Sequence, residues 1–173
     1  MLRTVTGLIV RPGEQAVRLV FHGSTDVEYL DFRREFPSPT SAIAWSRADL
    51  TNYTSFPDPM SEECIEYNGC TWAGWFAALD DQQTEGWVKA HNIIAIHSKH
   101  FAKYKLKTFR LRSGSKEIDA KVYDMCADSD CNGCCTKNSK KTGFLIDIES
   151  YSLNRFSVED GIIEWRCLDC DLP

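Results

Sequence analysis

The sequence of 173 residues lacks any long hydrophobic run and any surplus of basic residues. A helix that crosses a bilayer needs about 20 mostly apolar residues, and no stretch of the chain approaches this length. Lysine and arginine number 20 against 25 aspartate and glutamate residues, which gives a net charge of −5. Because binding to phosphate backbones normally requires a basic surface, we expect neither nucleic acid nor a membrane as a partner.

Cysteine is absent from the first 63 residues, whereas all eight cysteines lie between Cys64 and Cys170. An even number of cysteines confined to one part of a chain favours disulfides, which persist in oxidising compartments. Residues 1–10 contain too short an apolar stretch for a secretory signal, so no signal peptide is visible in this chain. From the cysteines we nevertheless expect an extracellular or periplasmic location.

The length suits one domain with its own core and an appended segment. Two apolar stretches, residues 5–10 and 16–21, flank a Pro-Gly turn and predict a β-hairpin. Residues 36–59 contain four prolines among polar residues, a composition typical of a linker. We therefore predict a β-rich extension over residues 1–62 that packs on a domain of residues 63–173.

Beyond residue 63, six short apolar segments separated by turn residues indicate an all-β domain. These segments are residues 71–79, 93–97, 104–112, 118–123, 144–148 and 161–168. Short strands at this spacing are typical of a sandwich or a closed barrel. Residues 73–79 and 148–156 fit a helix equally well, and no internal repeat is visible.

The cysteine spacing leaves two chemistries open. Cys131 and Cys134, with Cys167 and Cys170, form two Cys-x-x-Cys pairs about 30 residues apart, a pattern that can hold zinc through four thiolates. The remaining cysteines, and the adjacency of two of them, fit disulfides better. We expect no metal or cofactor and predict disulfides among Cys64, Cys70, Cys126, Cys131, Cys134, Cys135, Cys167 and Cys170, in a connectivity that the spacing does not decide.

Four stretches, in this order, resemble the second half of a double-psi β-barrel. They are Lys121–Cys126, the cysteine cluster of residues 131–135, Phe144–Ile148 and Gly161–Cys167. Expansins, family-45 endoglucanases, barwin-like proteins and bacterial rare lipoprotein A share this barrel. The resemblance covers roughly residues 64–170. With the hairpin, it implies an all-β fold class, a six-stranded double-psi β-barrel with an N-terminal β-hairpin extension.

The resemblance also implies two candidate catalytic residues, Asp147 and Asp124. In expansins and the related endoglucanases an aspartate follows a His-Phe pair and is the proton donor of the hydrolases. Asp147 takes that place, with Leu145-Ile146 instead of His-Phe. Asp124 is similar to the aspartate of the Asp-Arg-Gly turn of rare lipoprotein A, although Met125-Cys126 follow it. A role in capping turns is the alternative for both aspartates.

The endoglucanases carry a second carboxylate in a Tyr-Trp-Asp-Cys-Cys motif, which this chain lacks. Spacing selects no substitute among Glu63, Glu66 and Asp80. Ordinary glycoside hydrolysis needs an acid and a base about 5–9 Å apart, whereas one carboxylate suffices for binding. The sequence therefore favours a non-hydrolytic, expansin-like module that binds or loosens cell-wall polysaccharide. It leaves open whether the chain is an enzyme.

Four aromatic residues are candidates for substrate binding, namely Tyr67, Trp72, Trp75 and Trp87. Sugar rings stack well on flat aromatic side chains, although core packing is the alternative for each of them. Trp165 alternates with Ile163 in the last apolar segment and is expected in the core.

The one basic stretch, residues 99–116, predicts a solvated face or a patch for acidic polysaccharide. His91, His97 and His100 lack the spacing of a zinc-protease motif and receive no catalytic role. The expected partner is a polysaccharide or peptidoglycan, bound by a monomer. Two alternative functions stay open. One is a lytic glycosidase or transglycosylase acting on peptidoglycan or glucan, and the other is a protein-binding effector or protease inhibitor.

Overall fold

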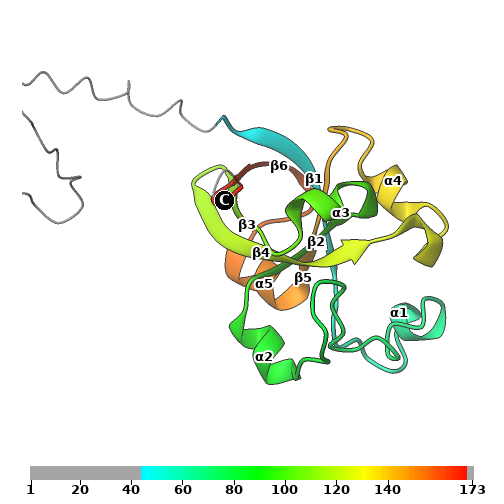
Figure 1. Ribbon diagram of the computed structural model, residues 1–173. Coiled ribbons are helices and arrows are strands. Elements are labelled where there is room, and N and C mark those ends of the chain that lie inside the picture. Colours follow the sequence, from blue (N-terminus) through cyan, green and yellow to red (C-terminus); the bar gives the residue numbers. More distant parts are fainter. Residues whose placement is uncertain (1–43, 171–173) are drawn as a thin grey trace, which may run out of the picture. The chain divides into compact units, whose positions relative to one another are not determined.

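The computed structural model describes residues 44–170, which form a closed six-stranded β-barrel with short helices in its connections (Figure 1). In chain order the elements are β1 (Ser46–Tyr53), α1 (Glu62–Ile65), α2 (Glu85–Ala90), β2 (Ile93–His97), α3 (Ser98–Tyr104), β3 (Thr108–Ser113), β4 (Lys116–Cys126), the 3-10 helix η1 (Asp128–Asp130), α4 (Cys134–Asn138), β5 (Leu145–Glu149), α5 (Ser150–Phe156) and β6 (Gly161–Cys167). None of the helices in this range is long and apolar enough to cross a membrane.

The strands neighbour one another in the order β1-β5-β2-β4-β3-β6, and β6 pairs with β1 to close the barrel. Two pairs are parallel, β1 with β5 and β2 with β4, and the other four are antiparallel. Exchanging β1, β2 and β3 for β4, β5 and β6 leaves this pairing pattern unchanged. This double-psi arrangement confirms the predicted fold class of the barrel.

The exchange reveals a repeat at the level of the structure, where the sequence shows none. Residues 93–104 and 145–156 each form a strand followed at once by a helix, β2 with α3 and β5 with α5. In each unit the last strand residue caps the helix. The His97 side chain accepts the N–H of Lys99 at 3.3 Å, and the Glu149 side chain accepts that of Tyr151 at 2.7 Å. The sequence does not show this repeat, because the two units share an apolar pattern but few identical residues.

The barrel interior holds the main core, which alternate residues of the strands supply. The buried side chains of this cluster are Ala48, Leu50, Ile94, Ile96, Phe109, Leu111, Ala120, Val122, Ile146, Ile148, Phe156, Ile163 and Trp165. Trp165 is 6% exposed and stacks on Phe109 and Phe144, each with ring centroids 4.4 Å apart. Its predicted place in the core is confirmed.

Two predicted strands differ from the structure. Residues 71–79 form turns, because Gly74 adopts a φ of +74° and the N–H of Trp75 bonds the carbonyl of Trp72. In the predicted segment 104–112, Tyr104 ends α3 and β3 begins only at Thr108, since Leu106 turns the chain with a φ of +63°. The helix expected within residues 148–156 is present as α5.

The sixth strand of the barrel comes from upstream of the predicted boundary. β1, Ser46–Tyr53, lies within the stretch assigned to a linker, yet it pairs with both β5 and β6. The barrel therefore starts near residue 46 instead of residue 63. The hairpin predicted over residues 5–21 lies outside the described residues, so an extension packed on the barrel stays a prediction.

All eight cysteines are paired, as predicted. The disulfides are Cys64–Cys70, Cys126–Cys135, Cys131–Cys134 and Cys167–Cys170. Two of them are neighbours, since the sulfurs of Cys131 and Cys135 lie 3.7 Å apart. The zinc alternative required Cys131 and Cys134 to join Cys167 and Cys170, and the structure does not bring these two pairs together.

Candidate functional site

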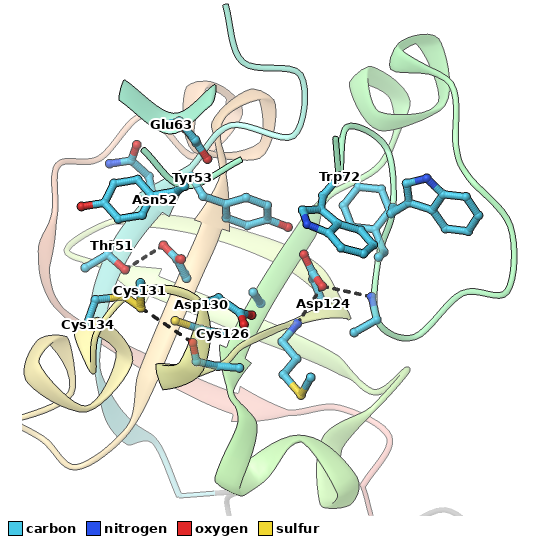
Figure 2. Close-up of a pocket in the computed structure, with 18 of the residues that line it drawn as sticks. Thr51, Asn52, Tyr53, Glu63, Trp72, Asp124, Cys126, Asp130, Cys131 and Cys134 are labelled. Carbon is cyan, nitrogen blue, oxygen red and sulfur yellow. Dashed lines mark hydrogen bonds between the residues drawn. A yellow bond between two sulfur atoms is a disulfide. The ribbon is translucent and has the colours of Figure 1, made fainter. Parts of the chain in front are cut away.

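A pocket of about 1160 Å³ lies on the outer face of the barrel, and four strands and two loops line it (Figure 2). Its floor comes from β1, β5, β2 and β4, which are neighbours in the barrel. Its rim comes from residues 61–79 and from the segment around η1 and α4. The pocket brings together both candidate catalytic residues and three of the four candidate aromatic residues.

The floor of the pocket is a single row of residues across the strands. Thr51 of β1 is opposite Asp147 of β5, Asp147 is opposite Ala95 of β2, and Ala95 is opposite Asp124 of β4. Their neighbours in sequence, such as Leu50 and Ile146, point into the barrel core. Because side chains alternate along a strand, the row faces outward, and the small Ala95 leaves space between the two aspartates.

An irregularity in β4 places Asp124 in this row. The register with β2 shifts between Ile94 and Ala95, so that Val122 and Asp124 are opposite consecutive residues and Tyr123 is the extra one. Without this bulge Ala95 would face Tyr123, and Asp124 would point toward the barrel core. A local backbone irregularity thus re-aims a carboxylate into the pocket.

Asp147 lies in the middle of β5, so it does not cap a turn. Thr51 Oγ1 donates a hydrogen bond of 2.7 Å to Asp147 Oδ1. Burial raises the pKa of Asp147 to about 7, and the nearby charges of Asp124, Asp160 and Glu63 act in the same direction. The carboxyl group is therefore able to hold a proton close to neutral pH.

Asp124 serves the architecture of the pocket as well as its chemistry. Its Oδ1 accepts the backbone N–H of Ala77 at 3.0 Å and that of Met125 at 2.9 Å, which ties the loop of residues 71–79 to β4. Burial raises the pKa of Asp124, and the two N–H bonds oppose the rise. Asp124 therefore has a structural role of the kind that the alternative of turn capping implied.

Tyr53 was missed by the sequence analysis. Figure 2 shows its ring between Thr51 on one side and Trp72 and Asp124 on the other. Its Oη is buried close to Asp124 and Ser55, yet it makes no hydrogen bond of normal geometry within residues 44–170. Burial raises the pKa of Tyr53 well above its ordinary value, so the hydroxyl is protonated and offers one donor and one acceptor to a ligand.

An exposed aromatic rim borders the polar floor. Trp72 is 63% exposed, Tyr67 50% and Trp75 43%, and all three line the pocket. Exposed large aromatic side chains grouped at a concave site are typical of ligand contact and not of core packing. We call Tyr67, Trp72 and Trp75 the aromatic rim.

Trp87 is placed elsewhere. It stacks on His91 at 3.9 Å and packs against Phe76 and Tyr123 in a second, smaller core cluster, and it does not line the pocket. The structure therefore gives it a packing role instead of the predicted contact with a ligand. Of the three acidic residues that spacing did not separate, Glu63 lines the pocket, whereas Glu66 and Asp80 do not.

All the ionisable side chains with an ordinary charge at neutral pH that line the pocket, among the described residues, are acidic. Its acidic residues are Glu62, Glu63, Asp124, Asp130 and Asp147, and no lysine, arginine or histidine of the described residues lines it. The ion pairs within residues 44–170 involve other carboxylates. Burial also raises the pKa of Glu63, which shows the same shortage of compensating charge.

Comparisons with known proteins found similar solved structures. No protein-family model and no curated protein matches the chain. A mutant of the GH45 endoglucanase EG27II in complex with cellobiose aligns over 70% of this chain and 80% of its own, with 12% identity and a TM-score of 0.45. The β-1,4-D-endoglucanase Cel45A from the blue mussel Mytilus edulis aligns over 73% and 81%, with 16% identity and a TM-score of 0.43.

Proposed function

We propose that the barrel is a non-hydrolytic module that binds or loosens cell-wall polysaccharide, in the manner of an expansin. The observation that carries this proposal is the aromatic rim beside a polar floor of hydroxyl and carboxyl groups. Sugar rings present apolar faces to aromatic side chains and hydroxyl edges to polar ones, so a polymer needs both kinds of surface. The four disulfides favour an extracellular or periplasmic setting for such a module.

The arrangement of the two aspartates bears on whether the module also cleaves its ligand. They lie two strand spacings apart across Ala95, so their Cα atoms are separated by roughly 10 Å. Asp147, with a pKa of about 7, is suited to donate a proton. Asp124 uses one oxygen to hold two backbone N–H groups, which favours a structural role over that of a free base. One free carboxyl group supports binding better than hydrolysis with two carboxylates.

Binding to insoluble polymers tests the proposal. We expect the full chain to sediment with at least one of cellulose, chitin and peptidoglycan. Replacing Trp72 by Ala should weaken this binding several-fold, because a rim side chain that is 63% exposed contributes contact area to a ligand and little to folding. Trp45 does not line the pocket, and its ring contacts Arg112 and Arg166. Replacing Trp45 by Ala is therefore a matched control for the loss of one tryptophan. If the full chain binds none of the three polymers, the proposal is contradicted.

The same preparations separate the module from a lytic enzyme. A non-hydrolytic module should release no soluble sugar or new reducing ends from purified wall polymer over a wide pH range. Release that disappears in Asp147→Asn and persists in Trp45→Ala would instead establish a glycosidase or transglycosylase with Asp147 as its acid.

A further inference from the structure

The carboxylates of the pocket have no counter-ion from the protein. The Oδ1 atoms of Asp124 and Asp147 accept hydrogen bonds from backbone N–H groups and from Thr51, respectively, while their Oδ2 atoms have no partner within residues 44–170. The two residues flank Ala95 on the pocket floor. A buried carboxylate without a paired cation is costly, so a cationic ligand would compensate it.

The hydroxyl group of Tyr53 lies beside the carboxylate of Asp124 and is a further group that a ligand can satisfy. Its Oη atom is buried in the pocket and unpartnered within the described residues, and a polar atom left in this way costs stability unless a bound molecule satisfies it. A phenolic oxygen beside two carboxylates can accept an N–H and donate an O–H. An amine next to a hydroxyl offers the matching groups.

A metal ion fits this floor less well than an organic cation. The groups of residues 44–170 that bring three or more potential metal ligands close together consist of disulfide-bonded cysteines and Asp169, and they do not include Asp124 or Asp147. The aromatic rim also has no function toward a bare ion. It suits a ligand that carries its positive charge on an extended body with apolar faces.

We infer, on the basis of the polysaccharide-binding function proposed above, that the preferred ligand is a polysaccharide with free amino groups, such as a glucosamine polymer. Its sugar rings lie on the aromatic rim, and an ammonium group sits over Ala95 between Asp124 and Asp147, within reach of Tyr53. The absence of lysine, arginine and histidine from the pocket lining makes the same site unfavourable for uronic-acid polymers.

Three oligosaccharides of equal length and linkage test this inference, because they differ only in the substituent at C2. Glucosamine, N-acetylglucosamine and glucose oligomers carry an ammonium, an acetamide and a hydroxyl group there. Calorimetric titration of the full chain near neutral pH, where the amine carries charge and Asp147 with its pKa of about 7 can ionise, should show the glucosamine oligomer binding about tenfold more tightly or better, since charge pairs in a partly buried site are worth that much. Added salt should reduce this advantage.

Three variants separate specific recognition from general attraction to an acidic protein. Asp147→Asn should remove most of the preference for the amine, measured as the ratio of the dissociation constants of the glucose and glucosamine oligomers, because Asn keeps the size and loses the charge. Glu159→Gln, which removes an exposed carboxylate outside the pocket lining, should leave the preference intact. Trp72→Ala should weaken all three oligomers alike.

The outcomes are distinguishable. Equal or weaker binding of the glucosamine oligomer, while the glucose or acetylated oligomer binds, would overturn the inference and keep the polysaccharide-binding function. An amine preference that Glu159→Gln reduces as much as Asp147→Asn does would overturn it too, because the attraction would then belong to the whole surface. If none of the oligomers binds and the insoluble polymers also fail, the proposed function itself is wrong.

Discussion

At the scale of single residues, Asp147 links the pocket to the stability of the barrel. Its pKa is about 7 in the folded protein against an ordinary value of 3.8, so the folded state holds this proton more tightly than the unfolded state does. Stability from this group is therefore present at acidic pH and is lost as the pH rises from about 4 toward and beyond 7. The ionised form of Asp147 destabilises the empty protein, and a bound ligand cation would offset this destabilisation.

Replacing Asp147 by Asn should remove this pH dependence. Thr51 can still donate its hydrogen bond to the amide oxygen, so the folded structure is retained. One pKa unit corresponds to about 1.4 kcal/mol, and since the side chain borders an open pocket we expect the variant to be about 1–3 kcal/mol more stable than the parent above pH 7. Below about pH 4 the two proteins should unfold alike. Thermal denaturation of both proteins from acidic to alkaline pH measures this difference in stability. A difference that is the same at every pH would contradict the prediction.

At the scale of secondary-structure elements, the strands that form short apolar runs between turn residues were predictable and the pocket was not. β2, β5 and β6 follow from their apolar residues and bounding turns. β1 was missed because only Ala48 and Leu50 of its residues enter the core cluster, and Pro-rich neighbours suggested a linker. The bulge at Tyr123 leaves no trace in an apolar pattern, so the sequence could name Asp124 and Asp147 but not show that they share a floor with Thr51 and Tyr53.

The loop that carries the aromatic rim was misread for a related reason. Residues 71–79 are mostly apolar, as in a buried strand, but Trp72 and Trp75 line the pocket instead of a core. Gly74 fixes the loop. It has a φ of +74°, its N–H bonds the carbonyl of Ser55, and an added Cβ would lie 2.2 Å from the carbonyl oxygen of Gln83 and 3.0 Å from the ring of Phe56.

Gly74→Ala should therefore displace the loop and disturb the positions of Trp72 and Trp75. We expect a loss of stability of about 1–3 kcal/mol from the unfavourable backbone and the clash, together with weaker polysaccharide binding. Gly114→Ala is the matched control, because Gly114 has a φ of +59° and no atom within 4 Å of an added Cβ. Chemical denaturation and polymer sedimentation measure the two effects. Equal losses in both variants would show that the contacts around Gly74 do not hold the rim.

At the scale of the whole molecule, closure of the barrel depends on a strand from the N-terminal side of the predicted boundary. β1 pairs with β5 through five residues and with β6 through five, and it supplies Ala48 and Leu50 to the core. Without it, β5 and β6 become unpaired edges, and the pocket loses Thr51 and Tyr53. Open edges and exposed core residues favour aggregation.

Two truncations should consequently behave in opposite ways. A chain that begins at residue 44 retains all six strands and should fold, with a cooperative thermal transition and polysaccharide binding close to that of the full chain, because the six strands and their core lie within residues 46–167. A chain that begins at residue 63, the boundary predicted from composition, should aggregate or unfold without a transition. Loss of β1 removes Ala48 and Leu50 from the core and exposes the core side chains that pack on them. Exposing several large side chains at about 1.5–3 kcal/mol each exceeds the stability of most domains. Circular dichroism, size-exclusion chromatography and the polymer assay compare the two.

A folded, binding-competent chain from residue 63 would show that β1 is dispensable. Loss of folding in the chain from residue 44 would instead show that residues 1–43 are needed for the barrel and do not merely extend it.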